Sequence, residues 1–204
     1  MSKHPHKPKP DLQRLFDLQH FLHKFHAIER IVYLPGKNPR YETDTEHTFT
    51  LAMTAWFLAQ YFDDIDTDKC IKLALVHDLV EIYAGDTYAF ADKAVLDSKT
   101  AREAKALGQI TKEWQDFPDM VQAIEDYEKL NSKESKFVFA LDKIMPPLVI
   151  FMGEGYTWQK HKITFAMHHE VKIESVAQSA AILDYYNQLV ELMQKNLDYF
   201  HLED

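Results

Sequence analysis

Several features that define other classes of protein are scarce in this sequence. Its 204 residues include a single cysteine, Cys70, so no intramolecular disulfide can form. Five glycines are few for a chain of many strands and tight turns, which argues against an all-β fold. The apolar stretch 141–152 is short and carries Asp142, Lys143 and two prolines, so we expect no membrane span. Since no secretory signal is recognisable either, we expect a cytoplasmic protein.

Positive charge is also scarce. The chain has 23 lysines and arginines against 32 aspartates and glutamates, a formal net charge of −9. Surfaces that bind nucleic acid are usually basic, so we expect no nucleic-acid partner. An acidic chain can still bind a small anion where a metal ion supplies local positive charge.

The pattern of apolar residues predicts one helical domain. Residues 1–10 are basic and rich in proline and predict a flexible arm, and residues 11–204 are long enough to bury one core. Apolar residues recur at helical spacing, and no stretch alternates as a strand does, so the predicted fold class is all-α. We expect helices over residues 12–28, from the capping residues 43–46 to about 61, and over 69–83, 96–114, 118–130, 132–145 and 171–197.

Proline and glycine predict where this helical pattern is interrupted. Residues 29–41 contain Pro35, Gly36 and Pro39 and predict an irregular loop. The pair Pro146-Pro147 is expected to end or kink the helix before it.

The adjacent pair His77-Asp78 lies in a predicted helix among Leu, Val and Ile side chains. Burying an imidazole and a carboxylate among apolar groups costs free energy unless something compensates it, and a metal ion would do so. Glu81 follows His77 by four residues and so lies on the same helix face. We therefore expect His77 and Asp78 to bind a metal ion, with Glu81 beside it.

Two further polar residues stand where a core side chain would be expected. His47 precedes the apolar run 49–58, and Asp142 lies within the apolar stretch 137–145. Together with His77 and Asp78 they would supply two nitrogen and two oxygen ligands. This set suits Mn, Fe, Co, Ni or Zn better than Ca, and the absence of cysteine argues against a structural zinc site.

These residues, in this order on a helical chain, resemble the HD-domain metal-dependent phosphohydrolases. The resemblance is carried by Glu46-His47, His77-Asp78-Leu-Val-Glu81, Gly85-Asp86 and the run 134–143 that contains Asp142, and it extends over most of the chain. Within that family the set is similar to the branch of bacterial 5′-deoxynucleotidases.

The resemblance implies a role for each matching position. One divalent ion (Mn, Co, Fe, Ni, Zn or Mg) would be held by His47, His77, Asp78 and Asp142. Glu81 would act near the attacking water, and Asp86 would position the sugar or the leaving oxygen. Phosphate contacts are expected from Arg30, with Lys37 and Arg40 as alternatives. The residue after Arg30 is often tryptophan in the family and is Ile31 here.

The implied activity is hydrolysis of the phosphomonoester of (deoxy)nucleoside 5′-monophosphates by water attack. Two alternatives stay open at this point: an HD-fold hydrolase of another phosphorylated metabolite (a triphosphate, phosphodiester or phosphonate), and a non-catalytic metal-binding module. The segments 31–41 and 83–92 are expected to build the pocket wall. His168 and His169 are expected at the surface or an interface. The apolar C-terminal helix, together with the resemblance, predicts a homodimer.

Overall fold

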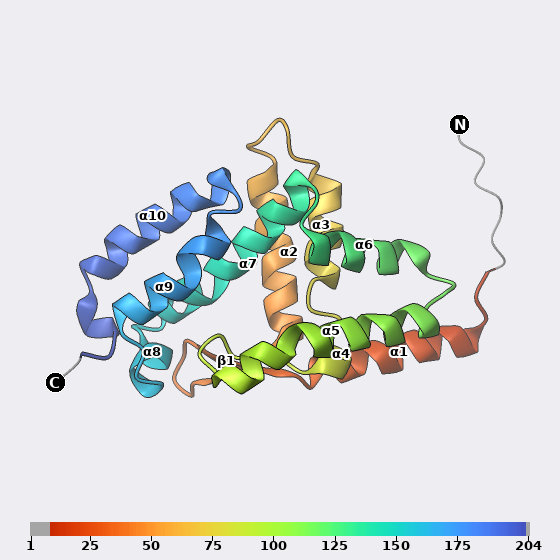
Figure 1. The fold of residues 1–204 in the computed structure, drawn as a ribbon, viewed down its shortest axis with the longest axis horizontal. Helices are drawn as coiled ribbons and strands as arrows, with labels where there is room; N and C mark the ends of the chain where they lie inside the picture. Colours follow the sequence, from red (N-terminus) through yellow and green to blue (C-terminus); the bar gives the residue numbers. More distant parts are fainter. Residues whose placement is uncertain (1–8, 203–204) are drawn as a thin grey trace.

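A computed structural model of the protein describes residues 9–202, so most of the predicted arm lies outside the described residues. The described chain is almost entirely helical (Figure 1), and the predicted all-α bundle is confirmed. Its helices are α1 (Leu12–His26), α2 (Asp44–Ala59), α3 (Thr67–Val76), α4 (Glu81–Ala84), α5 (Lys93–Glu113), α6 (Pro118–Lys129), α7 (Lys133–Met152), α8 (Tyr156–Lys160), α9 (Phe165–Val176), α10 (Ala180–Gln194) and the short 3₁₀ helix η1 (Leu197–Tyr199).

Side chains at the helix starts explain why the helices begin where they do. Thr43 accepts a hydrogen bond from the Glu46 backbone N–H, and the Glu46 side chain accepts one from the Thr43 N–H, which closes the capping box of α2. Ser132 and Ser135 form the same reciprocal pair at the start of α7. The predicted starts of both helices are confirmed. Two of the predicted metal ligands lie on these helices, His47 on α2 and Asp142 on α7.

The prediction of an irregular loop over residues 29–41 was wrong. The chain forms an antiparallel hairpin of β1 (Glu29–Leu34) and β2 (Arg40–Thr43), with an irregularity in register between Arg30 and Tyr33. Pro35, Gly36 and Pro39 lie in the connection between the strands. The hairpin is tied to the bundle by Thr157, whose hydroxyl accepts a hydrogen bond from the Tyr33 N–H at 3.0 Å.

Two predicted helices are each divided in the structure. The helix expected over 69–83 stops at Val76, and residues 77–80 form a turn before α4. The Leu79 N–H donates to the Val76 carbonyl, three residues back, which tightens the chain out of α-helical geometry. The helix expected over 171–197 is likewise two helices, α9 and α10, separated at residues 177–179.

The prolines at 146 and 147 do not end α7, which continues to Met152. Each proline removes one backbone N–H and so frees the carbonyl four residues earlier, at Asp142 and Lys143. Both prolines face a cavity, where the loss of a helical hydrogen bond is tolerated more readily than in a packed core.

Two clusters of buried side chains hold the bundle together. The larger one joins α2, α3, α7 and α10, and the smaller one joins α1, α3, α5 and α6. Figure 1 shows α2 upright between the arm of α7, α9 and α10 and the layer that contains α1 and α5. In residues 9–202 we find no helix with the length and hydrophobicity needed to cross a bilayer.

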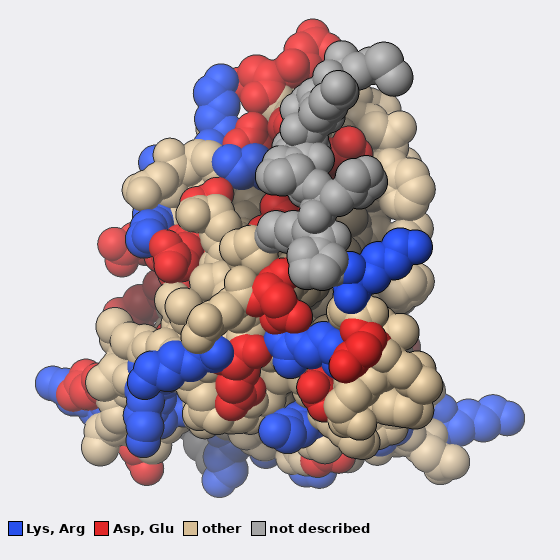
Figure 2. All heavy atoms as spheres, turned by 90° about the vertical axis from the view of Figure 1, so that its right-hand side faces the viewer, with Lys and Arg blue, Asp and Glu red and all other residues tan. Residues whose placement is uncertain are grey.

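Acidic and basic side chains are interspersed over one face of the molecule. Figure 2 shows this mixture on the side that faces right in Figure 1. Opposite charges at such short spacing largely cancel beyond a Debye length of about 10 Å, so this face presents no field of a single sign.

Gly155 lies where no other residue fits well. Its φ of +75° is left-handed, and an added Cβ would overlap the backbone of Tyr199. We predict that Gly155→Ala lowers the free energy of unfolding by roughly 2 kcal/mol or more, measured by urea denaturation. Gly108 is the matched control: a Cβ there meets nothing within 4 Å inside α5, so Gly108→Ala should raise stability by about 0.5–1 kcal/mol. Equal effects of the two substitutions would contradict this account.

Candidate metal centre

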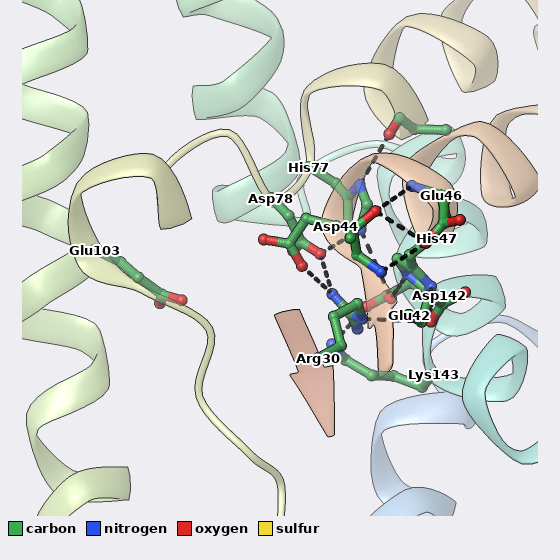
Figure 3. Close-up of polar contacts among 12 residues, drawn as sticks. Arg30, Glu42, Asp44, Glu46, His47, His77, Asp78, Glu103, Asp142 and Lys143 are labelled. Carbon is green, nitrogen blue, oxygen red and sulfur yellow. Dashed lines mark hydrogen bonds and ion pairs between the residues drawn. The ribbon is translucent and has the colours of Figure 1, made fainter. Parts of the chain in front are cut away.

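The four predicted ligands come together at the centre of the molecule. His47 extends from α2, His77 and Asp78 from the turn after α3, and Asp142 from α7. Each offers a ligand atom that lies within 4.8 Å of those of the other three. Figure 3 shows the side chains pointing toward one another from these separate elements.

The turn after α3 explains how two neighbouring residues face one point. Successive residues of an α-helix point about 100° apart, so His77 and Asp78 would diverge if α3 continued. His77 instead caps α3, and Asp78 lies in the following turn. The Nε2 of His77 and the Oδ2 of Asp78 are 2.8 Å apart.

The hydrogen bonding of His77 indicates that a cation belongs here. Its Nδ1 lies 2.8 Å from the Ala74 carbonyl oxygen. A carbonyl oxygen can only accept, so Nδ1 donates to it, and Nε2 is the ring nitrogen left to bind a metal ion. That atom is buried without a hydrogen bond among the described residues and faces the Asp78 and Asp142 carboxylates at 2.8 and 3.7 Å. A divalent cation placed here could bind this nitrogen and both carboxylates at once.

Further contacts hold the ligands in position. Asp142 Oδ1 lies 2.8 Å from His47 Nε2, and Asp142 Oδ2 accepts from Lys143 at 2.6 Å and from the Tyr127 hydroxyl at 3.4 Å. His47 Nδ1 lies 3.6 Å from Glu42. Such outer contacts fix the tautomer and the orientation of metal ligands. The set of two imidazoles and two carboxylates fits a first-row divalent ion, with room left for other ligands.

A second group of acidic side chains adjoins the first. Carboxylate oxygens of Asp44, Asp78 and Glu81 lie within 4.8 Å of one another. Burial, reinforced by the charge of Asp78, raises the pKa of Asp44 to about 6. Burial and the charges of Asp78 and Asp44 raise the pKa of Glu81 well above its usual range. Glu81 therefore has the raised proton affinity of a general base, and its Oε2 is buried without a hydrogen bond to any described residue.

Arg30 lies between the two acidic groups. Its Nη1 donates to Asp78 Oδ2 at 2.7 Å and to Asp44 Oδ1 at 3.1 Å, and Nε lies 3.7 Å from Glu42. Both hydrogen bonds use Nη1, so within residues 9–202 no hydrogen bond engages Nη2. The structure thus assigns Arg30 a role in holding carboxylates, and its expected phosphate contact remains a prediction.

A cavity of about 260 Å³ opens onto the acidic side of the centre. Its wall is built by β1, the segment after α4, and one face each of α5, α7, α8 and α9. Asp78, Glu81, Asp86 and Asp142 line it, and burial, with Asp78, raises the pKa of Asp86. The expected wall segment 83–92 contributes residues 86–90, whereas the segment 31–41 contributes only Ile31 and Val32.

Lys37 and Arg40 are not brought to this cavity. Lys37 is exposed in the hairpin connection, and neither residue lines the wall. Arg40 pairs with Glu46 at the surface, where it supports the capping box of α2. Both were expected as alternative phosphate contacts. Their positions in the hairpin leave them outside the lining of the cavity.

Several charged or polar residues of the site were not predicted from the sequence. Asp44 looked like a capping residue but is fully buried beneath Arg30. Lys99, Lys143 and Lys172 line the cavity from three different helices. His168 was expected at the surface or an interface, but it is 1% exposed, packs against Trp158 and lines the same cavity. A helical projection of α9 places residues 168, 171, 172 and 175 on one face, which was the available signal.

Known proteins resemble this chain in sequence. The human protein named 5′-deoxynucleotidase HDDC2 is 35% identical over 128 residues, which cover 60% of this chain and 58% of that protein. The bovine protein of the same name is 33% identical over 137 residues, 62% of this chain and 63% of that one. The chain thus aligns with less than two thirds of either relative.

Solved structures resemble it over a longer span. A crystal structure of a predicted metal-dependent phosphohydrolase from Magnetospirillum magnetotacticum MS-1 has a TM-score of 0.76 at 29% identity and covers 93% of this chain and 96% of that one. The PH0347 protein from Pyrococcus horikoshii OT3 has a TM-score of 0.61 at 20% identity, over 87% and 99%, and shows the fold alone. The family model described as HD domain matches residues 23–183, more than half of the chain. The chain therefore belongs to the HD domain family.

Proposed function

We propose that this protein is a metal-dependent phosphohydrolase that acts on the phosphomonoester of (deoxy)nucleoside 5′-monophosphates. The observation that carries the proposal is the convergence of His47, His77, Asp78 and Asp142 beside the buried Glu81 carboxylate. Of these residues, Asp78, Asp142 and Glu81 line one cavity. The relatives named 5′-deoxynucleotidase support the substrate class, and the solved structure of a predicted metal-dependent phosphohydrolase supports the reaction type.

His47, His77, Asp78 and Asp142 would hold one divalent ion, the native identity of which the ligand set leaves open among Mn, Fe, Co, Ni, Zn and Mg. Such an ion supplies Lewis acidity, which polarises the phosphoryl group and makes water acidic enough to attack at neutral pH.

Glu81 orients the attacking water and accepts its proton. Burial, with the charges of Asp78 and Asp44, raises the pKa of Glu81 and so increases the proton affinity of its carboxylate. Asp86, whose pKa is also raised, lines the same cavity and could protonate the leaving sugar oxygen. Arg30 contributes the unused donors of Nη2 toward phosphate oxygens.

Replacing Glu81 by glutamine keeps the shape of the side chain but removes its ability to accept a proton. We expect Glu81→Gln to retain the divalent ion and to lose roughly 10²–10⁴-fold in kcat toward nucleoside 5′-monophosphates. Elemental analysis and steady-state kinetics measure the two effects. The exposed Glu191 on α10 provides the control, since Glu191→Gln should act like the parent. Parental turnover by Glu81→Gln would show that the proton goes elsewhere.

Removing the His77 imidazole takes away one ligand and leaves the Asp78 and Asp142 carboxylates without their shared neighbour. We predict that His77→Ala, purified in the presence of manganese and desalted, contains much less metal than the parent. His20→Ala, at an exposed position of α1, should keep the full metal content. A metal content equal to that of the parent, measured in His77→Ala by elemental analysis, would refute the proposed metal site.

We also propose that the protein is a homodimer. The C-terminal helix was the expected interface, but Tyr186, Leu189 and Met193 of α10 are buried in the chain's own core. A more extensive apolar stripe lies along α2, where Phe49, Met53, Trp56 and Phe57 are 47–66% exposed, and Tyr61, just past the end of the helix, extends it at 68% exposed. An exposed apolar stripe of this kind is typical of an interaction surface. Cytoplasmic location stays a prediction.

A charge in the middle of the α2 stripe should prevent association. We expect the parent to sediment as a dimer and Trp56→Lys as a monomer, since a buried ammonium at an apolar interface costs several kcal/mol. Leu192→Lys, at a 47% exposed position of α10, should remain dimeric. Sedimentation of the parent as a monomer at every concentration would refute the proposal, and dissociation by Leu192→Lys alone would move the interface to α10.

A further inference from the structure

Lys172 of α9 is a buried lysine without a partner. Its side chain is 9% exposed, yet it makes no hydrogen bond or ion pair with any residue in the range 9–202. Lysines are seldom buried unless they are paired, because an ammonium group removed from water loses its hydration. The burial of Lys172 therefore needs a reason that the free protein does not supply.

The other cations of the cavity wall are all paired. Arg30 bonds Asp78 at 2.7 Å, Lys143 bonds Asp142 at 2.6 Å, and Lys99 lies 3.4 Å from Glu103. Lys172 alone among these four has no carboxylate of its own. Burial, together with repulsion from Lys143, lowers its pKa to about 7.

The position of Lys172 indicates what it faces. It lines the same cavity as Asp78, Glu81 and Asp142. Lys143 and Asp142 are the charged groups that act on it most strongly, ahead of Arg30 and Lys99. Lys172 thus lines the cavity that three acidic side chains, including two of the candidate metal ligands, also line. An anion bound in the cavity would supply the negative partner that the Lys172 ammonium group lacks.

We propose that Lys172 binds a non-reacting oxygen of the substrate's phosphate and selects a dianionic phosphomonoester. This deepens the proposed function and rests on it. A phosphodiester has one charge fewer and carries a second ester group where the ammonium would bind, so it gains less from this contact. A neutral nucleobase carbonyl would also accept a hydrogen bond, but it would leave the ammonium charge uncompensated among Lys143, Lys99 and Arg30.

Lys172→Met tests the proposal because methionine keeps the length of the side chain and removes the charge. If Lys172 is kept for binding at a cost in stability, its replacement should stabilise the fold and weaken the binding of phosphate. The melting temperature of the variant should rise by a few degrees, because an unpaired buried charge is lost. Its affinity for inorganic phosphate, measured by calorimetry on the manganese-loaded protein, should fall about tenfold or more. Lys172→Arg should restore most of the affinity, and the exposed Lys105→Met should change neither quantity.

Kinetics then locate the contact on the substrate. If Lys172 binds phosphate, Lys172→Met should raise KM for a nucleoside 5′-monophosphate and for deoxyribose 5-phosphate by the same factor, with a smaller change in kcat. An effect confined to the nucleotide would mean a base contact and overturn the proposal. Unchanged phosphate affinity, or a lower melting temperature in Lys172→Met, would overturn it as well. Failure of the parent to hydrolyse any monoester would sink the proposed function, while the phosphate affinity would still test Lys172.

Discussion

The structure depends on acidic side chains that repel one another yet are gathered in the interior. Asp44, Glu42, Glu81 and Asp142 are each at most 4% exposed, and Asp78 adjoins them. Buried carboxylates of like charge either take up protons or require cations. Here both responses occur: the pKa values of Asp44 and Glu81 are raised, whereas Asp78 and Asp142 stay ionised beside His77, Arg30 and Lys143. The carboxylates thus divide into proton-binding groups and cation-binding groups within a few ångströms.

Arg30 separates these two kinds of carboxylate. Through Nη1 it joins β1 to Asp44 on α2 and to Asp78 in the turn after α3. The guanidinium stays charged at any relevant pH, so it acts as a permanent counterion on one side of Asp78. A divalent ion on the other side would complete the neutralisation. His77 and Arg30 together keep Asp78 anionic, whereas burial and the charges of Asp78 and Asp44 raise the proton affinity of Glu81 despite the nearby Arg30.

The sequence predicted the four ligand side chains and most of the helices, but not the elements that orient them. The capping residues Thr43 and Ser132 and the ordered set of His and Asp residues are local signals, readable without knowledge of the fold. The hairpin at residues 29–43 could not be read in this way. Its strands are short, its register is irregular, and Tyr33 is held by the Thr157 hydroxyl from 124 residues away in the sequence. The turn at residues 77–80 was hidden because its sequence, His-Asp-Leu-Val, is compatible with a helix.

The metal-binding end of the cavity and its wall differ in how much a substitution would disturb the packing of the protein. The proposed metal site is built from α2, the turn after α3, and α7, and these helices share the larger buried core and can shift little without disturbing its packing. The wall that faces it is built from β1, the segment 86–90 and the inner face of α9, whose side chains project into open space. A substitution in the metal site changes ligand geometry and so the reaction, whereas one in the wall changes charge or shape at a small cost in packing. Ile31 and Lys172 both belong to this wall. Residues of this kind can distinguish one phosphorylated substrate from another while the metal chemistry beneath them stays the same.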